Sequence, residues 1–188
     1  MAERSPAARL APPGAPGPSD AAPALRHPQR VRSLVLMCPW ARCDAYAQGI
    51  FEHMKTIKAR LRPEEFMTYI QLLIFSKATW DDTQALAGLV DGRREAAENA
   101  QPQPLHALEA QAAACTTHNT HAELGRINCP ALVIGGEADI FTPRWMAEEV
   151  ASGISGAELH LYSGAGHAFH WERIDDFNPR VRNWLAAH

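Results

Sequence analysis

Residues 127–171 read INCPALVIGGEADIFTPRWMAEEVASGISGAELHLYSGAGHAFHW, a pattern that predicts a strand, a helix and a second strand. The apolar run at residues 131–134 is short, partly β-branched and stopped by two glycines, which is typical of a strand buried on both faces. Thr142 is suited to cap a helix that the following proline opens and that ends near Gly153. Residues 157–162 then supply the second strand.

A loop with a functional side chain follows each predicted strand. Asp139 comes after the first strand and His167 comes after the second. Because a strand, a helix and a strand form a right-handed parallel crossover, both loops leave neighbouring strands at the same edge of one sheet, where ligands bind in open parallel sheets. An Asp and a His at that edge are suited to be the orienting acid and the general base of a nucleophilic triad.

Both residues also have simpler interpretations. Asp139 could only cap the helix after Thr142, and Glu137 is a second carboxylate in the same loop. His167 could be a loop histidine bonded to the backbone. The loop sequence GEADIFTP around Asp139 and the two glycines shortly before His167 favour the triad.

The order of these residues resembles the C-terminal part of the α/β-hydrolase superfamily, in which a serine elbow precedes the acid and the histidine. Residues 25–36, LRHPQRVRSLVL, resemble the segment that closes the helix behind the nucleophile and opens the sixth strand. The resemblance covers residues 25–188. It implies a partial α/β-hydrolase fold of the α/β class, a three-stranded parallel sheet with flanking helices and a helical cap insertion.

Four segments follow from composition and from this resemblance. Residues 1–26 are rich in Pro, Ala, Gly and Ser and are expected to form a disordered arm. Residues 27–38 hold the first core strand, and residues 39–126 hold the helical cap. Residues 127–188 form the C-terminal core that carries the acid and the histidine.

The cap segment contains four helix-like stretches. The first is residues 44–61, and the second begins at Pro63. Asp81 or Asp82 can cap a third helix that Gly92 ends, and residues 105–124 suggest a fourth. In the family, such a cap shapes the substrate pocket and shields it from water.

A finer resemblance rests on residues 39–42 (PWAR), the helix with Phe51, residues 69–75 with the following Trp80, residues 118–121 (HNTH) and residues 177–178. These stretches resemble the subgroup that holds 3-oxoadipate enol-lactonases and aminoacrylate hydrolases. This resemblance implies hydrolysis of a small-molecule carboxylic ester, a lactone or a related bond, with no metal and no cofactor. It assigns Asp139 and His167 to catalysis. Four aromatic residues are then expected to contact the substrate, namely Trp40, Phe141, Phe169 and Trp171.

The nucleophile of such a triad is not evident. Residues 17–21, GPSDA, only faintly imitate a G-x-S-x-G elbow, and Pro18 and Pro23 would disrupt the strand and helix around Ser19. A thiol at Cys38 could replace the serine, although buried cysteines are usually inert. We therefore expect a truncated chain that lacks the serine elbow and oxyanion loop and is weakly active or inactive. The alternative is a non-catalytic remnant that serves as a binding or assembly module.

Composition excludes several classes of partner. The net charge of −3 has scattered signs, which argues against nucleic acid and anionic membranes. The sequence has no apolar run of about twenty residues and no hydrophobic signal core, so we expect a cytoplasmic protein. The four cysteines lack C-x-x-C spacing and are expected to be free thiols.

Two further patterns concern metals and partners. The pairs His118/His121 and His167/His170 have H-x-x-H spacing but no H-E-x-x-H pattern, so no metal site is expected. The strand at residues 31–37 would leave an apolar edge with unpaired backbone groups. A homo-oligomer or a partner chain is expected to cover it, and the alternative is a poorly soluble chain.

Overall fold

The computed structural model describes residues 21–188. In chain order its helices and strands are α1 Ala22–Arg26, η1 Pro28–Arg30, β1 Leu34–Met37, α2 Ala45–Lys58, α3 Pro63–Ile74, α4 Lys77–Asp81, α5 Thr83–Glu98, α6 Leu105–Thr116, η2 His121–Arg126, β2 Ala131–Gly136, α7 Arg144–Gly153, β3 Glu158–Tyr162, α8 Phe169–Glu172 and α9 Ile174–Ala187. None of these helices is long and apolar enough to cross a membrane.

The strands form one parallel sheet in the order β1-β2-β3. Leu34 pairs with Ala131, and Gly136 pairs with Tyr162, so β2 has a neighbour on each side. Every residue of β2 is buried, as its continuous apolar run predicts for a central parallel strand. The predicted α/β class and three-stranded parallel sheet are confirmed.

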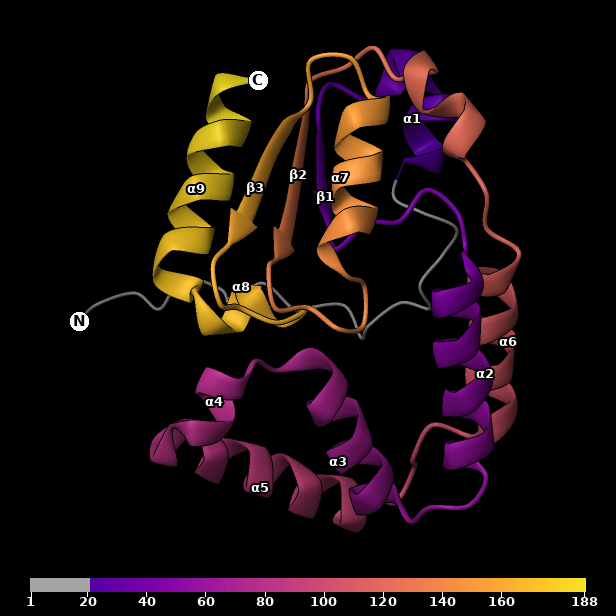
Figure 1. Ribbon diagram of the computed structural model, residues 1–188, viewed down its shortest axis with the longest axis vertical. Coiled ribbons are helices and arrows are strands. Elements are labelled where there is room, and N and C mark those ends of the chain that lie inside the picture. Colours follow the sequence, from indigo (N-terminus) through magenta and orange to yellow (C-terminus); the bar gives the residue numbers. More distant parts are fainter. Residues whose placement is uncertain (1–20) are drawn as a thin grey trace, which may run out of the picture.

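Helices cover both faces of the sheet (Figure 1). Because alternate residues of a strand face opposite sides, Leu36 and Val133 pack towards α1 and α7, whereas Leu132 and Ile134 pack towards α8 and α9. Trp184 of α9 is buried in the second of these clusters. Both faces of the central strand are therefore apolar and covered, whereas Glu158 and Leu159 at the start of β3 are exposed.

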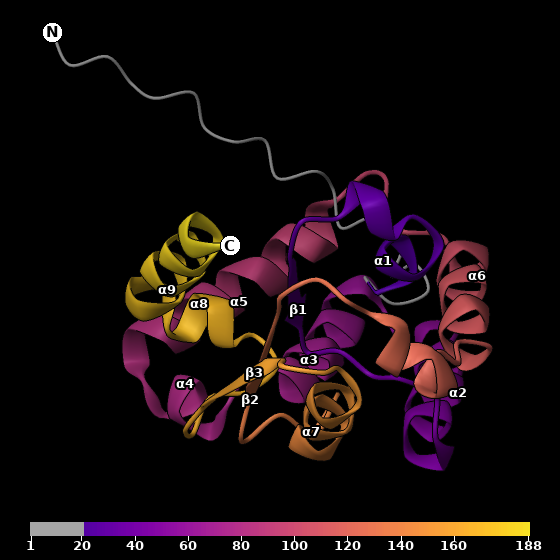
Figure 2. The ribbon, with the colours of Figure 1, turned by 90° about the horizontal axis from the view of Figure 1, so that it is seen from above.

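Helices α2 to α6 form the cap. Figures 1 and 2 show α3, α4 and α5 beyond the carboxyl ends of the strands, with α2 and α6 side by side. The cap has its own apolar cluster, which joins it to Met146 of α7. The carboxylates of Asp44 and Asp82 accept hydrogen bonds from the backbone at the starts of α2 and α5, at 2.8 and 2.7 Å, as expected for capping residues.

Some boundaries differ from the predictions. Residues 22–26, expected in the arm, form α1, and residues 1–20 lie outside the described part. Gly92 does not end the third cap helix, because α5 continues to Glu98. A glycine inside a helix costs only about 1 kcal/mol, which the packing of α5 on α3 outweighs. The fourth helix ends at Thr116, earlier than predicted.

Candidate active site

The acid loop and the histidine loop are joined through their backbones. Glu137 N donates to Tyr162 O at 3.0 Å, and Ala138 N donates to Ala165 O at 2.9 Å. A Cβ atom at Gly136 would lie 2.2 Å from Gly166 O, so only glycine allows the two loops to approach this closely. The backbone itself therefore brings the ends of β2 and β3 together.

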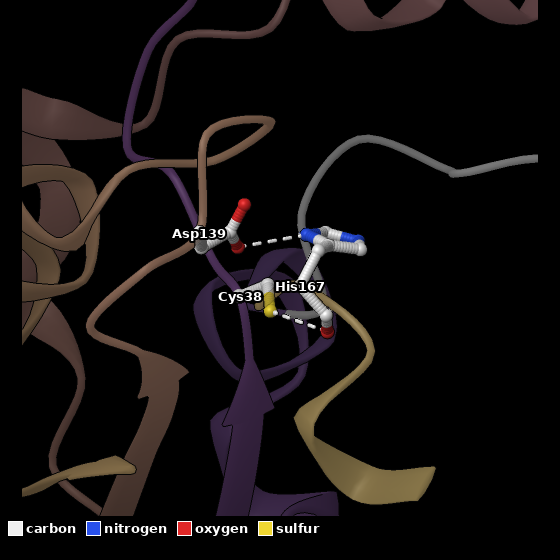
Figure 3. A group of neighbouring side chains, drawn as sticks. All are labelled: Cys38, Asp139 and His167. Atoms are coloured by element: carbon white, nitrogen blue, oxygen red, sulfur yellow. Dashed lines mark hydrogen bonds and ion pairs between the residues drawn. The ribbon is translucent and has the colours of Figure 1, made fainter. Parts of the chain in front are cut away.

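Asp139 and His167 meet at this junction (Figure 3). His167 Nδ1 lies 2.9 Å from Asp139 Oδ2. The Asp139 side chain is 1% exposed, and that of His167 is 25% exposed. The structure thus brings together the two residues that the parallel crossover predicted to be neighbours.

Three further donors hold the Asp139 carboxylate. Its Oδ1 accepts from Phe141 N at 2.8 Å and from Thr142 N at 2.9 Å. Its Oδ2 also accepts from Thr142 Oγ1 at 2.8 Å. Buried and hydrogen-bonded on both oxygens, the carboxylate is fixed in one orientation. Glu137, the other carboxylate of the loop, is more exposed and lies 4.0 Å from Arg144.

Thr142 does not cap the following helix, which corrects the sequence prediction. The N-cap residue of α7 is Pro143, and no side chain caps it. The Thr142 hydroxyl lies instead within 2.9 Å of both Asp139 Oδ2 and His167 Nδ1. Because the carboxylate is buried next to this hydroxyl, its charge attracts the hydroxyl proton more strongly than the start of the helix does.

The second ring nitrogen of His167 is the one available for proton transfer. When Nδ1–H donates to Asp139, Nε2 carries the lone pair and can accept a proton. Within residues 21–188, the hydrogen bonds of this ring all involve Nδ1. The geometry therefore provides an oriented base, whereas the described residues supply no hydroxyl or thiol bonded to Nε2.

Cys38 follows β1 and lies beside this pair (Figure 3). Its thiol contacts the backbone oxygen of His167 at 3.5 Å rather than the ring. Burial, and next the charge of Asp139, raise the pKa of this thiol well above its ordinary value. The geometry and the raised pKa both argue against Cys38 as a substitute nucleophile.

A metal ion would have to use the same three side chains. Donor atoms of Cys38, Asp139 and His167 lie within 4.8 Å of one another. A thiol binds metals as the thiolate, which the raised pKa disfavours, and Asp139 already bonds to His167. The donor set therefore fits a hydrogen-bonded pair better than a metal centre.

Two of the four aromatic residues assigned to the substrate lie in a row that leads away from the histidine. The Phe141 ring packs edge-on against His167 at 4.9 Å between centroids. Phe51 lies 5.9 Å from Phe141, and Trp40 lies 6.1 Å from Phe51. The buried Trp40 Nε1 has no hydrogen-bond partner among the described residues.

The other two residues lie elsewhere. Phe169 is completely buried and stacks on Tyr162 at 5.5 Å, as part of the core under the sheet. Trp171 is exposed and stacks on Phe75 at 6.0 Å. It lines a cavity of about 590 Å³ between the cap and α8. Trp171 is accessible to a ligand, and Phe169 supports the core.

The sequence prediction did not identify Glu172. Its carboxylate bonds to the backbone of the histidine loop and to the cap. Burial alone would raise the pKa of this carboxyl, but the hydrogen bonds from Thr79, Ser76 and Gly166 together hold it below its ordinary value. The only sequence signal was an acid five positions after the histidine.

Known proteins resemble this chain over most of its length. A family model described as alpha/beta hydrolase fold matches residues 21–174. A 2-hydroxy-6-oxononadienedioate/2-hydroxy-6-oxononatrienedioate hydrolase of Cupriavidus pinatubonensis (strain JMP 134 / LMG 1197) is 31% identical over 176 residues, which is 90% of this chain and 59% of that protein. A 2-hydroxy-6-oxo-6-phenylhexa-2,4-dienoate hydrolase of Comamonas testosteroni is 28% identical over 166 residues, which is 86% of this chain and 57% of that protein.

A solved structure shows the same fold. The enol-lactonase from Burkholderia xenovorans LB400 superposes with a TM-score of 0.73 at 20% identity, covering 88% of this chain and 60% of that one. The chain thus spans less than two thirds of the length of these relatives. The match to the family model extends over most of the chain, including both loops of the site. The chain belongs to the alpha/beta hydrolase fold family.

Proposed function

We propose that this chain carries the acid and base half of a hydrolase for small carboxylic esters, lactones or related bonds. Asp139 orients His167, and His167 Nε2 takes a proton from a nucleophile. The supporting observation is the 2.9 Å contact between His167 Nδ1 and the buried Asp139 carboxylate. A buried carboxylate fixes the imidazole tautomer and stabilises the imidazolium that forms during proton transfer.

The substrate class is inferred from the relatives and from the aromatic row. The matched relatives are named as hydrolases of oxo-dienoate compounds and as an enol-lactonase. Phe141 offers apolar surface next to the base, and Trp40 lies at the far end of the same row with a buried N–H that has no partner among the described residues. These features suit a small acid with an apolar body. Trp171 at the outer cavity is proposed to contact the substrate as it enters.

The nucleophile is proposed to come from outside residues 21–188, in the same chain or in a second one. Leu34 N donates to Pro130 O, just before β2, at 2.9 Å, and Cys38 N donates to Ile134 O of β2 at 2.8 Å. The backbone groups of Val35 and Met37 therefore point to the other side of β1. Within the described residues β1 is an edge strand. A parallel strand paired there would end at the same edge as His167, where it could present a hydroxyl.

One observation favours a second possibility. Because no described hydroxyl or thiol bonds to Nε2, the isolated chain could be a non-catalytic module that retains the cap for binding or assembly. Hydrolysis of p-nitrophenyl acetate by the purified chain, by His167→Ala and by His106→Ala separates the two functions. His106 is an exposed histidine of α6 and serves as the matched control.

Turnover that His167→Ala abolishes and His106→Ala retains supports the hydrolase. Turnover that survives His167→Ala contradicts the assigned base. No turnover in the unaltered chain favours the module over a nucleophile in the same chain. The edge of β1 is tested separately by size-exclusion chromatography with light scattering. A stable monomer that stays in solution at high concentration would contradict a covered edge.

A further inference from the structure

Glu172, the last residue of α8, bonds to two parts of the molecule that are far apart in sequence. One carboxylate oxygen, Oε2, accepts from Gly166 N at 2.7 Å, next to His167. The other oxygen, Oε1, accepts from Ser76 N at 2.8 Å and from Thr79 Oγ1 at 2.5 Å. A single side chain therefore joins the histidine loop to the start of α4 in the cap.

The backbones of the same two segments also touch. Ala168 N donates to Ile74 O at 2.8 Å. A Cβ atom at Gly166 would lie 2.6 Å from Ile74 O and 2.8 Å from Ser76 N. The turn between α3 and α4 thus sits directly on the residues that flank His167.

The carboxylate is held by neutral donors alone. None of the ion pairs among residues 21–188 includes Glu172, so N–H and O–H groups from both segments compensate its charge. Hydrogen bonds to an ionised acceptor are stronger than those between neutral groups. If the cap side withdrew, Oε1 would lose both donors and the carboxylate would be free to rotate. The contact to Gly166 would then weaken as well.

We propose that Glu172 is a positioning residue that couples the seating of the cap to the orientation of His167. This proposal rests on the proposed function, in which His167 is the base. When the turn between α3 and α4 is seated, Glu172 holds Gly166, and the histidine ring stays against Asp139. When the cap lifts, the loop is released and the base loses its fixed position. The base is thereby in place only when the cap covers the site.

The test uses hydrogen exchange and NMR of the complete chain, which need no turnover. Thr79→Val removes one donor on the cap side and keeps the side-chain shape. Thr56→Val is its matched control, because the Thr56 hydroxyl bonds only within α2. Glu172→Gln is compared with Glu148→Gln, a glutamate bonded to Arg144 on the surface of α7.

The measured quantities are the exchange rate of the Gly166 amide and the resonance of the proton on His167 Nδ1. Because a hydrogen bond to a charged group is lost, we expect exchange at Gly166 to be about tenfold faster in Glu172→Gln. In Thr79→Val we expect exchange of the Gly166 amide to be about threefold faster or more, because the Glu172 carboxylate loses one of its two hydrogen bonds to the cap. The ring resonance should shift in both variants and stay unchanged in both controls.

An unchanged Gly166 rate and an unchanged ring resonance in Thr79→Val would overturn the coupling. If Glu172→Gln does not fold, Thr79→Val still decides the question. A chain that shows the coupling but whose esterase activity survives His167→Ala would refute only the proposed function. An active chain without the coupling would refute only the role of Glu172.

Discussion

Replacing Asp139 by Asn tests the central contact of the site, because it keeps the side-chain shape and exchanges one acceptor for a donor. The amide oxygen is expected to keep the two backbone hydrogen bonds that Oδ1 accepts from Phe141 and Thr142. The amide nitrogen then replaces Oδ2 and faces His167 Nδ1. Since both groups cannot donate, the ring must move its proton to Nε2. The nitrogen that serves as the base is then occupied.

The magnitude follows from the bonds that are lost. Oδ2 accepts from Thr142 Oγ1 at 2.8 Å and lies 2.9 Å from His167 Nδ1. Each bond to a charged group contributes about 1.5–3 kcal/mol, but the hydroxyl can reverse and the ring can change tautomer. We therefore expect the free energy of unfolding to fall by about 1–3 kcal/mol. In a serine-protease triad the equivalent change lowers turnover about 10⁴-fold through the wrong tautomer.

Two measurements check Asp139→Asn. Urea unfolding followed by the fluorescence of the five tryptophans gives the change in stability. The ¹⁵N shifts of the His167 ring give the tautomer. The matched control is Asp44→Asn, because Asn caps a helix about as well as Asp and should leave α2 intact. If the ring keeps its proton on Nδ1 in Asp139→Asn, the assigned hydrogen bond is wrong.

Three further predictions concern the surroundings of the site. Gly136→Ala places a methyl group 2.2 Å from a backbone oxygen and should lower stability by about 1–3 kcal/mol, whereas Gly49→Ala, in open space inside α2, should raise it by about 0.5–1 kcal/mol. Burial lowers the pKa of His118 and His170 in the folded chain. Below about pH 6.5 the unfolded chain therefore binds more protons than the folded chain does, and the melting temperature should fall as the pH drops. Because burial raises its pKa, Cys38 should react with a thiol reagent only on unfolding.

Each of these predictions has a contradicting result. Equal stability of the two glycine variants would show that the loops can separate without cost. A melting temperature that is flat between about pH 6.5 and pH 5 would mean that the buried histidines take up protons without penalty. Fast reaction of Cys38 in the folded chain, judged against Cys38→Ala, would mean that the site opens readily.

The adjacency of the acid and the histidine could be predicted because it depends on topology more than on detailed packing. The apolar run at residues 131–134 marks the central strand, and residues 157–162 mark its neighbour. A parallel crossover then places both following loops at one edge, whatever the packing of the side chains. Asp139 and His167 lie together for this reason.

The remaining features depend on contacts that local sequence does not encode. Thr142 suits a helix cap equally well, but its hydroxyl lies against both the Asp139 carboxylate and His167, which is 25 residues further along the chain. Glu172 bonds to residues 93 and 96 positions away. Phe169 and Trp171 are both aromatic and only two positions apart, yet one is buried and the other exposed. Which of them faces the core is decided by the position of α8 under the sheet.

The contacts that fix the catalytic pair converge on one short loop. A methyl group at Gly136 of β2 would collide with the backbone of the histidine loop. A methyl group at Gly166 of that loop would collide with the backbone of the cap at Ile74 and Ser76. The histidine loop is therefore clamped between the sheet and the turn that precedes α4. All of these contacts come from residues 74–172. The acid, the base and the residues that clamp their two loops therefore all lie within this range.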